Sequence, residues 1–357
     1  MDPHASATFR RNFPGATFIE APVSRVDPLI LLDSAALRPG ELDCLIGGPP
    51  CQSFSYNNRK RSVTDERAQL FRDYLRLVRR LAPRTLVMEN VPGILTIGEG
   101  AVIEEITRRL AKLGYAIGVR ILYAEDYGVP QERRRVFIVG TRLGWDWSLF
   151  PNGSHGPTDK PSPTSNPFVH RWSLSKTAKR RALVTVWDAI GDLPPLCSGG
   201  GADSMMYAAP PRTEYQARLR RGSTCLLNHV TSDISDQLLR RIERVPEAGN
   251  WRDIPRYLLP AGMRRARLSD HTKRYGRLDR TAQCCTILTK CDPHWGGYIH
   301  PRDDRVISVR EAARLQSFPD RFRFVGGRSE QYRQVGNAVP PLMAAALGRS
   351  LKHHIQH

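Results

Sequence analysis

This chain of 357 residues lacks three sequence features, and each absence excludes a class of protein or site. It has no apolar run of about 18 residues, the length that a membrane-spanning helix needs, and no signal-like start. Its 7 cysteines are odd in number and show no metal-site spacing. We therefore expect a protein of a reducing, cytoplasmic setting, with no metal and no membrane partner.

Four residues in the last third come nearest to a set of metal ligands: Cys284, Cys285, Cys291 and His294. Adjacent cysteines are poor partners for one tetrahedral ion. We interpret these residues as ordinary strand residues instead.

Acidic residues are scarce relative to basic ones. Lys and Arg together number 54 and Asp and Glu 35, which gives a formal net charge of +19. Phosphate binding readily explains such an excess, so the composition favours a nucleic-acid partner. Codon bias toward arginine is the alternative explanation, and charge alone does not separate the two.

A single cysteine follows what reads as a short buried strand. Asp43 to Ile46 leads into the run Gly-Pro-Pro-Cys-Gln-Ser at 48–53, which places Cys51 at the carboxyl end of that strand. In an open parallel α/β sheet, ligand-binding and catalytic residues lie at this edge, and the prolines stiffen the turn. Cys51 is therefore a candidate nucleophile. A buried structural thiol is the alternative, but it suits this Gly-Pro approach and polar exit less well.

An acidic residue ends a second apolar run. Thr85 to Met88 reads as a strand, and Glu89 precedes the turn at Pro92-Gly93. If the two strands are parallel neighbours, Cys51 and Glu89 emerge on the same edge and face one substrate. Taken alone, Glu89 reads as a solvated loop acid.

A basic run precedes a third apolar segment. Gln131 to Arg135 leads into the strand-like Val136 to Gly140. Alternation at the strand entrance aims Arg133 and Arg135 to the same side. A solvated basic run before a strand is the competing interpretation.

Five segments, in this order, resemble the motifs of the bacterial cytosine carbon-5 DNA methyltransferases. They are Gly-Gly-Pro-Pro-Cys-Gln-Ser-Phe-Ser (47–55), Met-Glu-Asn-Val-Pro-Gly (88–93), Gln-Glu-Arg-Arg-Arg (131–135), Arg-Glu-Ala-Ala-Arg-Leu-Gln-Ser-Phe-Pro (310–319) and Gly-Asn-Ala-Val-Pro-Pro (336–341). The resemblance covers the chain up to about Leu347, apart from a poorly matched middle stretch.

The resemblance implies a reaction and a cofactor. The Cys51 thiolate attacks carbon 6 of cytosine, and Glu89 stabilises the charge at ring nitrogen 3. Arg135, supported by Arg133, assists at the exocyclic oxygen. Carbon 5 takes a methyl group from S-adenosyl-L-methionine, a base removes the carbon-5 proton, and the thiolate leaves. The cofactor-binding residues implied are Asp33, Gly48, Pro50, Leu70, Asn337 and Val339.

Such an enzyme has to rotate its cytosine out of the double-stranded DNA. The polar and basic segment from Ser53 to Glu66 is expected to close over DNA by binding phosphates. The DNA-binding residues expected are Gln52, Ser55, Arg59, Lys60 and Arg61 near the nucleophile, and Arg264, Arg265 and Lys273 in the middle region. Solvated surfaces are the alternative for both groups.

The periodicity predicts a doubly wound α/β sheet, which the resemblance identifies as a Rossmann-like, S-adenosylmethionine-dependent methyltransferase domain with a smaller, irregular target-recognition domain. Elements expected are helices at 3–13, 70–81, 101–113, 308–316 and 339–351 and strands at 17–19, 116–123 and 136–139. We expect a catalytic domain at 1–150, a linker at 151–181, target recognition at 182–275, and a return segment at 276–357 that completes the catalytic domain.

The start of the chain departs from the family. The Phe-Ala-Gly-x-Gly-Gly strand and turn that holds the methionine part of the cofactor is absent, and Asp2 to Ala5 resembles the stretch just after the ribose-binding acid. We expect either further residues upstream or a separate polypeptide that supplies the missing strand. A non-catalytic DNA-binding homologue is the third alternative.

Two further expectations concern the substrate and the partners. One branch of the family methylates cytosine in tRNA with the same motifs, but the sizeable middle region favours DNA, because duplex recognition needs a domain to read the groove. The resemblance also raises a cognate restriction endonuclease as a partner and predicts a cytoplasmic, nucleoid-associated protein of bacterial type.

Overall fold

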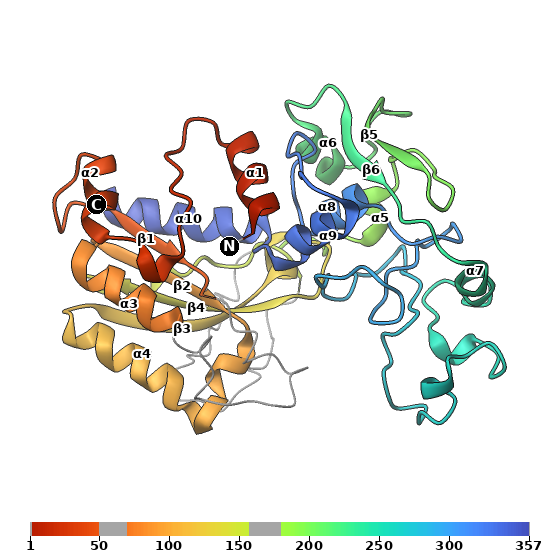
Figure 1. Ribbon diagram of the computed structural model, residues 1–357, viewed down its shortest axis with the longest axis horizontal. Helices are drawn as coiled ribbons and strands as arrows, with labels where there is room; N and C mark the ends of the chain where they lie inside the picture. The colour runs from red at the N-terminus through yellow and green to blue at the C-terminus, as the bar shows by residue number, and fades with distance from the viewer. Residues whose placement is uncertain (1, 50–69, 157–179, 357) are drawn as a thin grey trace.

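The structure, a computed structural model, describes residues 2–49, 70–156 and 180–356. They form two lobes (Figure 1). The first lobe has a central sheet between helices, and the second, drawn in green and blue, is rich in loops. The chain builds the first lobe, passes through the second, and returns to the first with its last helix. The C-terminus therefore lies beside the sheet.

The sheet of the first lobe has four strands in the order β1-β2-β4-β3. Their bounds are β1 Cys44–Gly47, β2 Thr85–Asn90, β3 Ala116–Tyr123 and β4 Arg134–Thr141. β1 and β2 are parallel, whereas β4 is antiparallel to both β2 and β3. Consequently β1, β2 and β3 end, and β4 begins, at one edge of the sheet.

The predicted strand-helix alternation is wrong after β3. Only a short 3₁₀ helix, Ala124–Tyr127, lies between β3 and β4. A parallel crossover needs about a dozen residues or more, and residues 124–133 are too few, so β4 pairs with β3 in the antiparallel direction. The strand expected at 17–19 is also wrong, because those residues have no regular secondary structure.

Helices cover both faces of the sheet. Helices α3 (Leu70–Leu81) and α4 (Ala101–Lys112) pack on one face, and α10 (Pro341–Gln356) packs on the other. α3 buries side chains at helical spacing and ends before Pro83, as predicted. α4 also ends as predicted, since Gly114 follows it with a φ of +84°.

Two short helices precede β1. α1 (Pro3–Asn12) is capped by Asp2, whose carboxylate accepts hydrogen bonds from the His4 and Ala5 amides. α1 is anchored to the far end of the chain, because Asn12 exchanges two hydrogen bonds with the backbone of Arg323. α2 (Pro28–Ser34) packs against α3.

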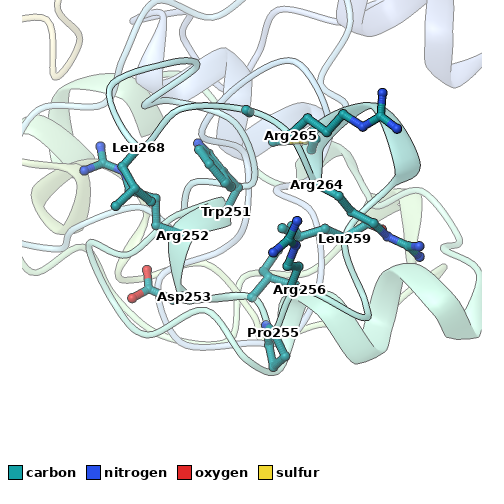
Figure 2. Close-up of a pocket in the computed structure, with 12 residues that line it drawn as sticks. Trp251, Arg252, Asp253, Pro255, Arg256, Leu259, Arg264, Arg265 and Leu268 are labelled. Carbon is teal, nitrogen blue, oxygen red and sulfur yellow. The ribbon is translucent and has the colours of Figure 1, made fainter.

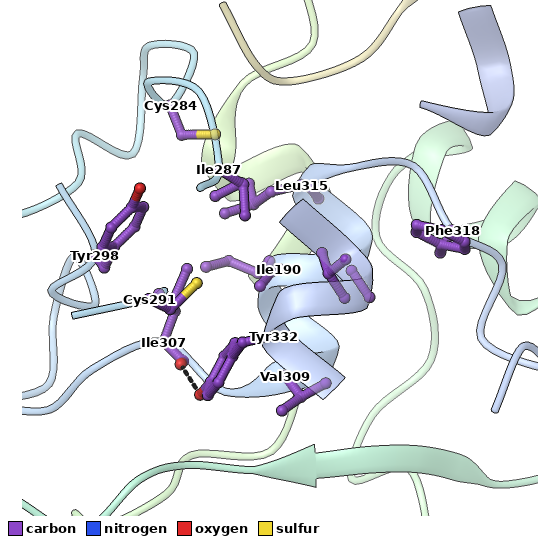
Figure 3. Close-up of a cluster of buried hydrophobic side chains, with 14 of the residues drawn as sticks. Ile190, Cys284, Ile287, Cys291, Tyr298, Ile307, Val309, Leu315, Phe318 and Tyr332 are labelled. Carbon is purple, nitrogen blue, oxygen red and sulfur yellow. Dashed lines mark hydrogen bonds between the residues drawn. The ribbon is translucent and has the colours of Figure 1, made fainter. Parts of the chain in front are cut away.

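The second lobe surrounds a core of buried side chains, part of which Figure 3 shows. Its elements are α5 (Val186–Ile190), β5 (Gly201–Met205), α6 (Glu214–Arg220), β6 (Leu226–Val230), α7 (Asp236–Ile242), α8 (Val309–Leu315) and α9 (Arg328–Asn337). This core joins α5 and α6 to α8 and α9. Residues up to about 338 pack into this lobe, and the predicted domain boundaries stay a prediction.

Helix α8 is the centre of the second lobe. Every residue of α8 is buried, including Arg310, Glu311 and Arg314. Arg314 donates to Asp192 at 2.5 Å and to Asp320 at 2.6 Å, and the buried Glu311 carboxylate pairs with Arg305 at 2.8 Å. Buried charges need such partners, because an unpaired one is strongly destabilising.

Candidate active site

The carboxyl ends of β1 and β2 lie side by side and are tied together. The Asn90 side chain donates to the carbonyl oxygen of Pro49 at 3.3 Å. A Cβ at Gly48 would lie 3.2 Å from a carboxylate oxygen of Glu89, so glycine allows the two strands to end this close together. The segment that leads toward Cys51 therefore leaves β1 beside the carboxyl group of Glu89.

A tyrosine of α3 links the two strands from one face of the sheet. The hydroxyl of Tyr74 lies 3.0 Å from the carbonyl oxygens of Leu45 in β1 and Val87 in β2. Its ring lies against Gly47, where a Cβ would come within 2.5 Å of it. The sequence placed Tyr74 only on the apolar face of the helix. A hydroxyl on that face was the one available signal of a further role.

Glu89 pairs with an arginine from the start of β4. The carboxylate lies 2.8 Å from Nε of Arg135, and both side chains are largely buried. Burial raises the pKa of Glu89, and the nearby Arg135 and Arg133 oppose the shift without cancelling it. The structure thus brings together an acid that retains its proton more readily than usual and a guanidinium donor.

Arg133 lies near Glu89 but makes its hydrogen bonds elsewhere. Its side chain is almost fully buried and donates to the carbonyl oxygens of Ile287 at 3.0 Å, Gly336 at 2.8 Å and Ala338 at 3.0 Å. Its guanidinium therefore holds segments of the second lobe against the entrance of β4. The expected role of Arg133 in support of Arg135 stays a prediction.

Two residues of the quoted motifs have a similar coupling role that was not predicted. Gln131 accepts a hydrogen bond from the Ile287 amide at 3.0 Å and donates to Gln316 at 2.5 Å. Gln316 in turn donates to the carbonyl oxygen of Ala338 at 3.0 Å. The only sequence signal was their presence in the motifs, because the partners of Gln131 are more than 150 residues away.

Three of the expected cofactor residues, Leu70, Asn337 and Val339, lie in segments on the two faces of the sheet near the end of β1. Leu70 begins α3, the helix whose Tyr74 reaches β1. Val339 packs with the core between the sheet and α10. Asn337 is flanked in the sequence by Gly336 and Ala338, the residues whose carbonyl groups Arg133 binds. The structure thus brings these residues and Gly48 toward one edge.

Asp33 is not brought to this edge. It is exposed near the end of α2, next to Leu32, which packs against Leu77 and Leu81. These leucines belong to the last part of α3, which leads into the start of β2 rather than its end. Asp33 therefore lies toward the opposite end of the sheet from Glu89, and the expectation that it binds the cofactor is corrected.

Several expected site residues lie outside the described residues. These are Pro50, Cys51, Gln52, Ser55, Arg59, Lys60 and Arg61.

The middle region contains a basic hollow of about 630 Å³ (Figure 2). Arg264 and Arg265 line it, as do Arg252 and Arg256, which the sequence did not single out. Asp253 carries the one carboxylate among the lining residues. This carboxylate accepts a hydrogen bond from the Asn250 amide at 2.8 Å and so caps a short helix. The hollow therefore presents guanidinium groups with little neutralisation. The third expected residue, Lys273, is exposed and does not line it.

Comparisons with known proteins identify the family of the chain. The model of the C-5 cytosine-specific DNA methylase family matches residues 1–353. The chain belongs to this family. It is 34% identical to the type II methyltransferase M.AgeI of Thalassovita gelatinovora, over 98% of this chain and 91% of that protein. It is 31% identical to the type II methyltransferase M.DdeI of Desulfomicrobium norvegicum, over 99% of this chain and 82% of that protein.

A solved structure shows the same fold as well. The crystal structure described as a putative DNA modification methyltransferase encoded within a prophage of E. coli has a TM-score of 0.71 and 26% identity, and the match covers 100% of this chain and 91% of that one. The chain is thus a DNA (cytosine-5)-methyltransferase with a Rossmann-like fold, and its cofactor is S-adenosylmethionine. Among the described residues, no helix is long and apolar enough to cross a membrane.

The described residues fit one side of a cofactor site. Gly48 has no side chain between the backbone of β1 and the carboxyl group of Glu89, so the end of β1 presents bare main chain at this point. Leu70, Asn337 and Val339 would hold the cofactor around this point. When bound, S-adenosylmethionine supplies the methyl group.

The raised pKa of Glu89 predicts a pH-dependent contribution to stability. Because the folded chain holds this proton more tightly than the unfolded chain, the stability due to protonated Glu89 is present below its usual pKa of 4.5 and is lost as pH rises through the higher folded value. The difference in unfolding free energy between the wild type and Glu89→Gln should therefore shift against the wild type as pH rises above 4.5. Urea denaturation across this range measures it, and a difference that moves in the opposite direction would contradict the assignment.

Proposed function

We propose that this enzyme methylates carbon 5 of cytosine in a specific sequence of double-stranded DNA through a covalent adduct with Cys51. The observation that carries the proposal is the Glu89 carboxyl group, which is paired with Arg135 at 2.8 Å and lies beside Gly48, from which the chain runs to Cys51. Attack on an electron-poor ring requires a nucleophile and an acid close together, and one edge of the sheet can present both.

Each of these residues has its own role in the reaction. The Cys51 thiolate forms a bond to carbon 6, and the electron pair displaced into the ring makes carbon 5 nucleophilic. Glu89 provides a proton at ring nitrogen 3, and Arg135 stabilises charge at the exocyclic oxygen. After methyl transfer a base removes the carbon-5 proton, the double bond re-forms, and the thiolate leaves.

Arg133, Gln131 and Gln316 position this machinery rather than touch the base. Their hydrogen bonds reach the carbonyl groups of Ile287, Leu315 and Ala338 and hold the entrance of β4 against the second lobe. A small displacement of the strand entrance would move Arg135 away from Glu89. These positioning residues therefore support catalysis through geometry.

Duplex DNA is the substrate that the architecture favours. The target carbon is stacked inside a duplex, so the cytosine has to be everted. The second lobe supplies a large surface next to the catalytic edge, and its basic hollow fits phosphates of the DNA backbone. Its relatives M.AgeI and M.DdeI are named type II methyltransferases. We therefore propose that the chain modifies a site that a cognate restriction endonuclease cuts.

The outer edge of β1 offers a place for a further strand. Ile46 in this strand is 71% exposed, although a strand of a doubly wound sheet is ordinarily buried on both faces. Other large apolar side chains are exposed in the same part of the chain: Phe9, Phe13, Ile19, Val23, Leu29 and Ile30. We propose that this surface receives a further strand that carries the glycine-rich cofactor turn.

Trapping with 5-fluorocytosine tests the nucleophile and the substrate together. Fluorine blocks removal of the carbon-5 substituent, so the wild type should remain covalently bound to duplex DNA that carries the analogue, and Cys51→Ser should form no adduct. Glu89→Gln should slow adduct formation by about 10²- to 10⁴-fold, the usual contribution of general acid catalysis. A tRNA carrying the analogue is the control substrate, and trapping on tRNA alone would overturn the DNA assignment.

Salt dependence tests the basic hollow. Arg252→Gln and Arg256→Gln should each weaken duplex binding and lower the slope of log affinity against log salt by about 1, because each phosphate contact releases about one counterion. Fluorescence anisotropy with a mixed-sequence duplex measures both quantities. Arg79→Gln on the exposed face of α3 is the control and should leave the slope unchanged. An equal change in the control would show that net charge, not the hollow, binds the DNA.

Calorimetry with S-adenosylmethionine tests the outer edge of β1. A complex of this chain with the glycine-rich strand, or a chain that includes that strand, should bind the cofactor more tightly than this chain alone. Ile46→Asp should weaken that binding, because it places a charge on the surface to be covered. Leu268→Asp, at a similarly exposed residue of the second lobe, is the matched control. Equal affinity with and without the strand would contradict the proposal.

A further inference from the structure

An exposed tryptophan stands apart from the other surface residues of the second lobe. Trp295 is 52% exposed. A single exposed apolar side chain needs no explanation by itself. Trp295 is not isolated, however, because the guanidinium carbon of Arg274 lies 5.1 Å from the centre of its ring. An aromatic face and a cation together are the groups that bind unpaired bases of nucleic acids.

The ring is carried by a braced loop. The His294 ring contacts Trp295 edge to face at 5.0 Å, and a His294 ring nitrogen lies 3.2 Å from the Tyr275 hydroxyl. The Tyr275 amide donates to the Pro293 carbonyl at 2.6 Å, and the Trp295 amide donates to that of Asp292 at 2.9 Å. Two segments distant in sequence therefore fix the backbone under an exposed ring.

The loop is attached directly to the catalytic edge. Its preceding segment runs beside the entrance of β4, where the Cys284 amide donates to the Pro130 carbonyl at 3.0 Å and the Ile287 carbonyl accepts from Arg133. Gly336 lies against the Leu288 carbonyl group with no room for a Cβ. Only residues 289–294 separate this anchored segment from Trp295. The exposed ring is therefore tied by a short connection to the strand that presents Arg135.

We propose that Trp295 is a stacking platform for a base of the substrate duplex that eversion of the cytosine leaves unstacked. The inference rests on the proposed function, since it requires a duplex from which a base is rotated. Eversion breaks stacking contacts, and an aromatic face that replaces one of them lowers the free energy of the everted state. Arg274 adds charge that attracts the strand and holds the ring in place.

Two duplexes of identical mixed sequence test the proposal without knowledge of the methylation site. One is intact, and the other has a single abasic position, which leaves neighbouring bases unstacked. The wild type should prefer the abasic duplex, and Trp295→Ala should reduce that preference by about tenfold because a base-stacking contact is lost. Trp295→Phe keeps an aromatic face and should retain most of the preference. Anisotropy titrations of the whole chain measure the affinity of each protein for both duplexes.

The controls separate the failure of this inference from the failure of the proposed function. Met206→Ala removes another exposed apolar side chain of the same lobe and should leave the preference unchanged. If the wild type binds neither duplex, DNA as substrate is overturned, and the stacking role with it. If the wild type binds both but Trp295→Ala has the wild-type preference, the stacking role alone is overturned.

Discussion

The ion pair between Glu89 and Arg135 depends on the opposite directions of two neighbouring strands. Glu89 is near the end of β2 and Arg135 near the start of β4, and in an antiparallel pair the end of one strand meets the beginning of the other. Had β4 run parallel to β2, its first residues would lie at the far edge of the sheet. The short connection after β3 therefore does more than close the sheet, since it delivers an arginine to the acid.

The sequence predicted the elements of this arrangement better than the contacts between them. Apolar spacing was enough to locate α3 and α4, because each buries a regular stripe of side chains, and a continuous run located β3, in which five consecutive residues are buried. The reversed direction of β4 could also have been predicted from the few residues that precede it. The bonds of Gln131 and Arg133 could not, since their partners lie in a lobe with little periodicity. Asp33 was misplaced because position along the chain does not determine which end of a sheet a helix approaches.

The entrance of β4 makes the two lobes depend on each other. Arg133 is bonded to carbonyl groups of residues 287, 336 and 338, which belong to the second lobe and to the turn before α10. Any change in the second lobe that shifts these carbonyl groups also shifts the strand that carries Arg135. The lobe that we propose to contact DNA is thus joined through hydrogen bonds to the strand that carries Arg135.

The protonation of Glu89 follows from a competition that the substrate would alter. Burial raises its pKa, and the guanidinium groups of Arg135 and Arg133 lower it. A cytosine whose exocyclic oxygen accepts a hydrogen bond from Arg135 would draw that donor away from the carboxylate. The ring would also displace water from the edge and bury the acid further. Both effects favour the protonated form, so entry of the base itself would prepare Glu89 to donate to ring nitrogen 3.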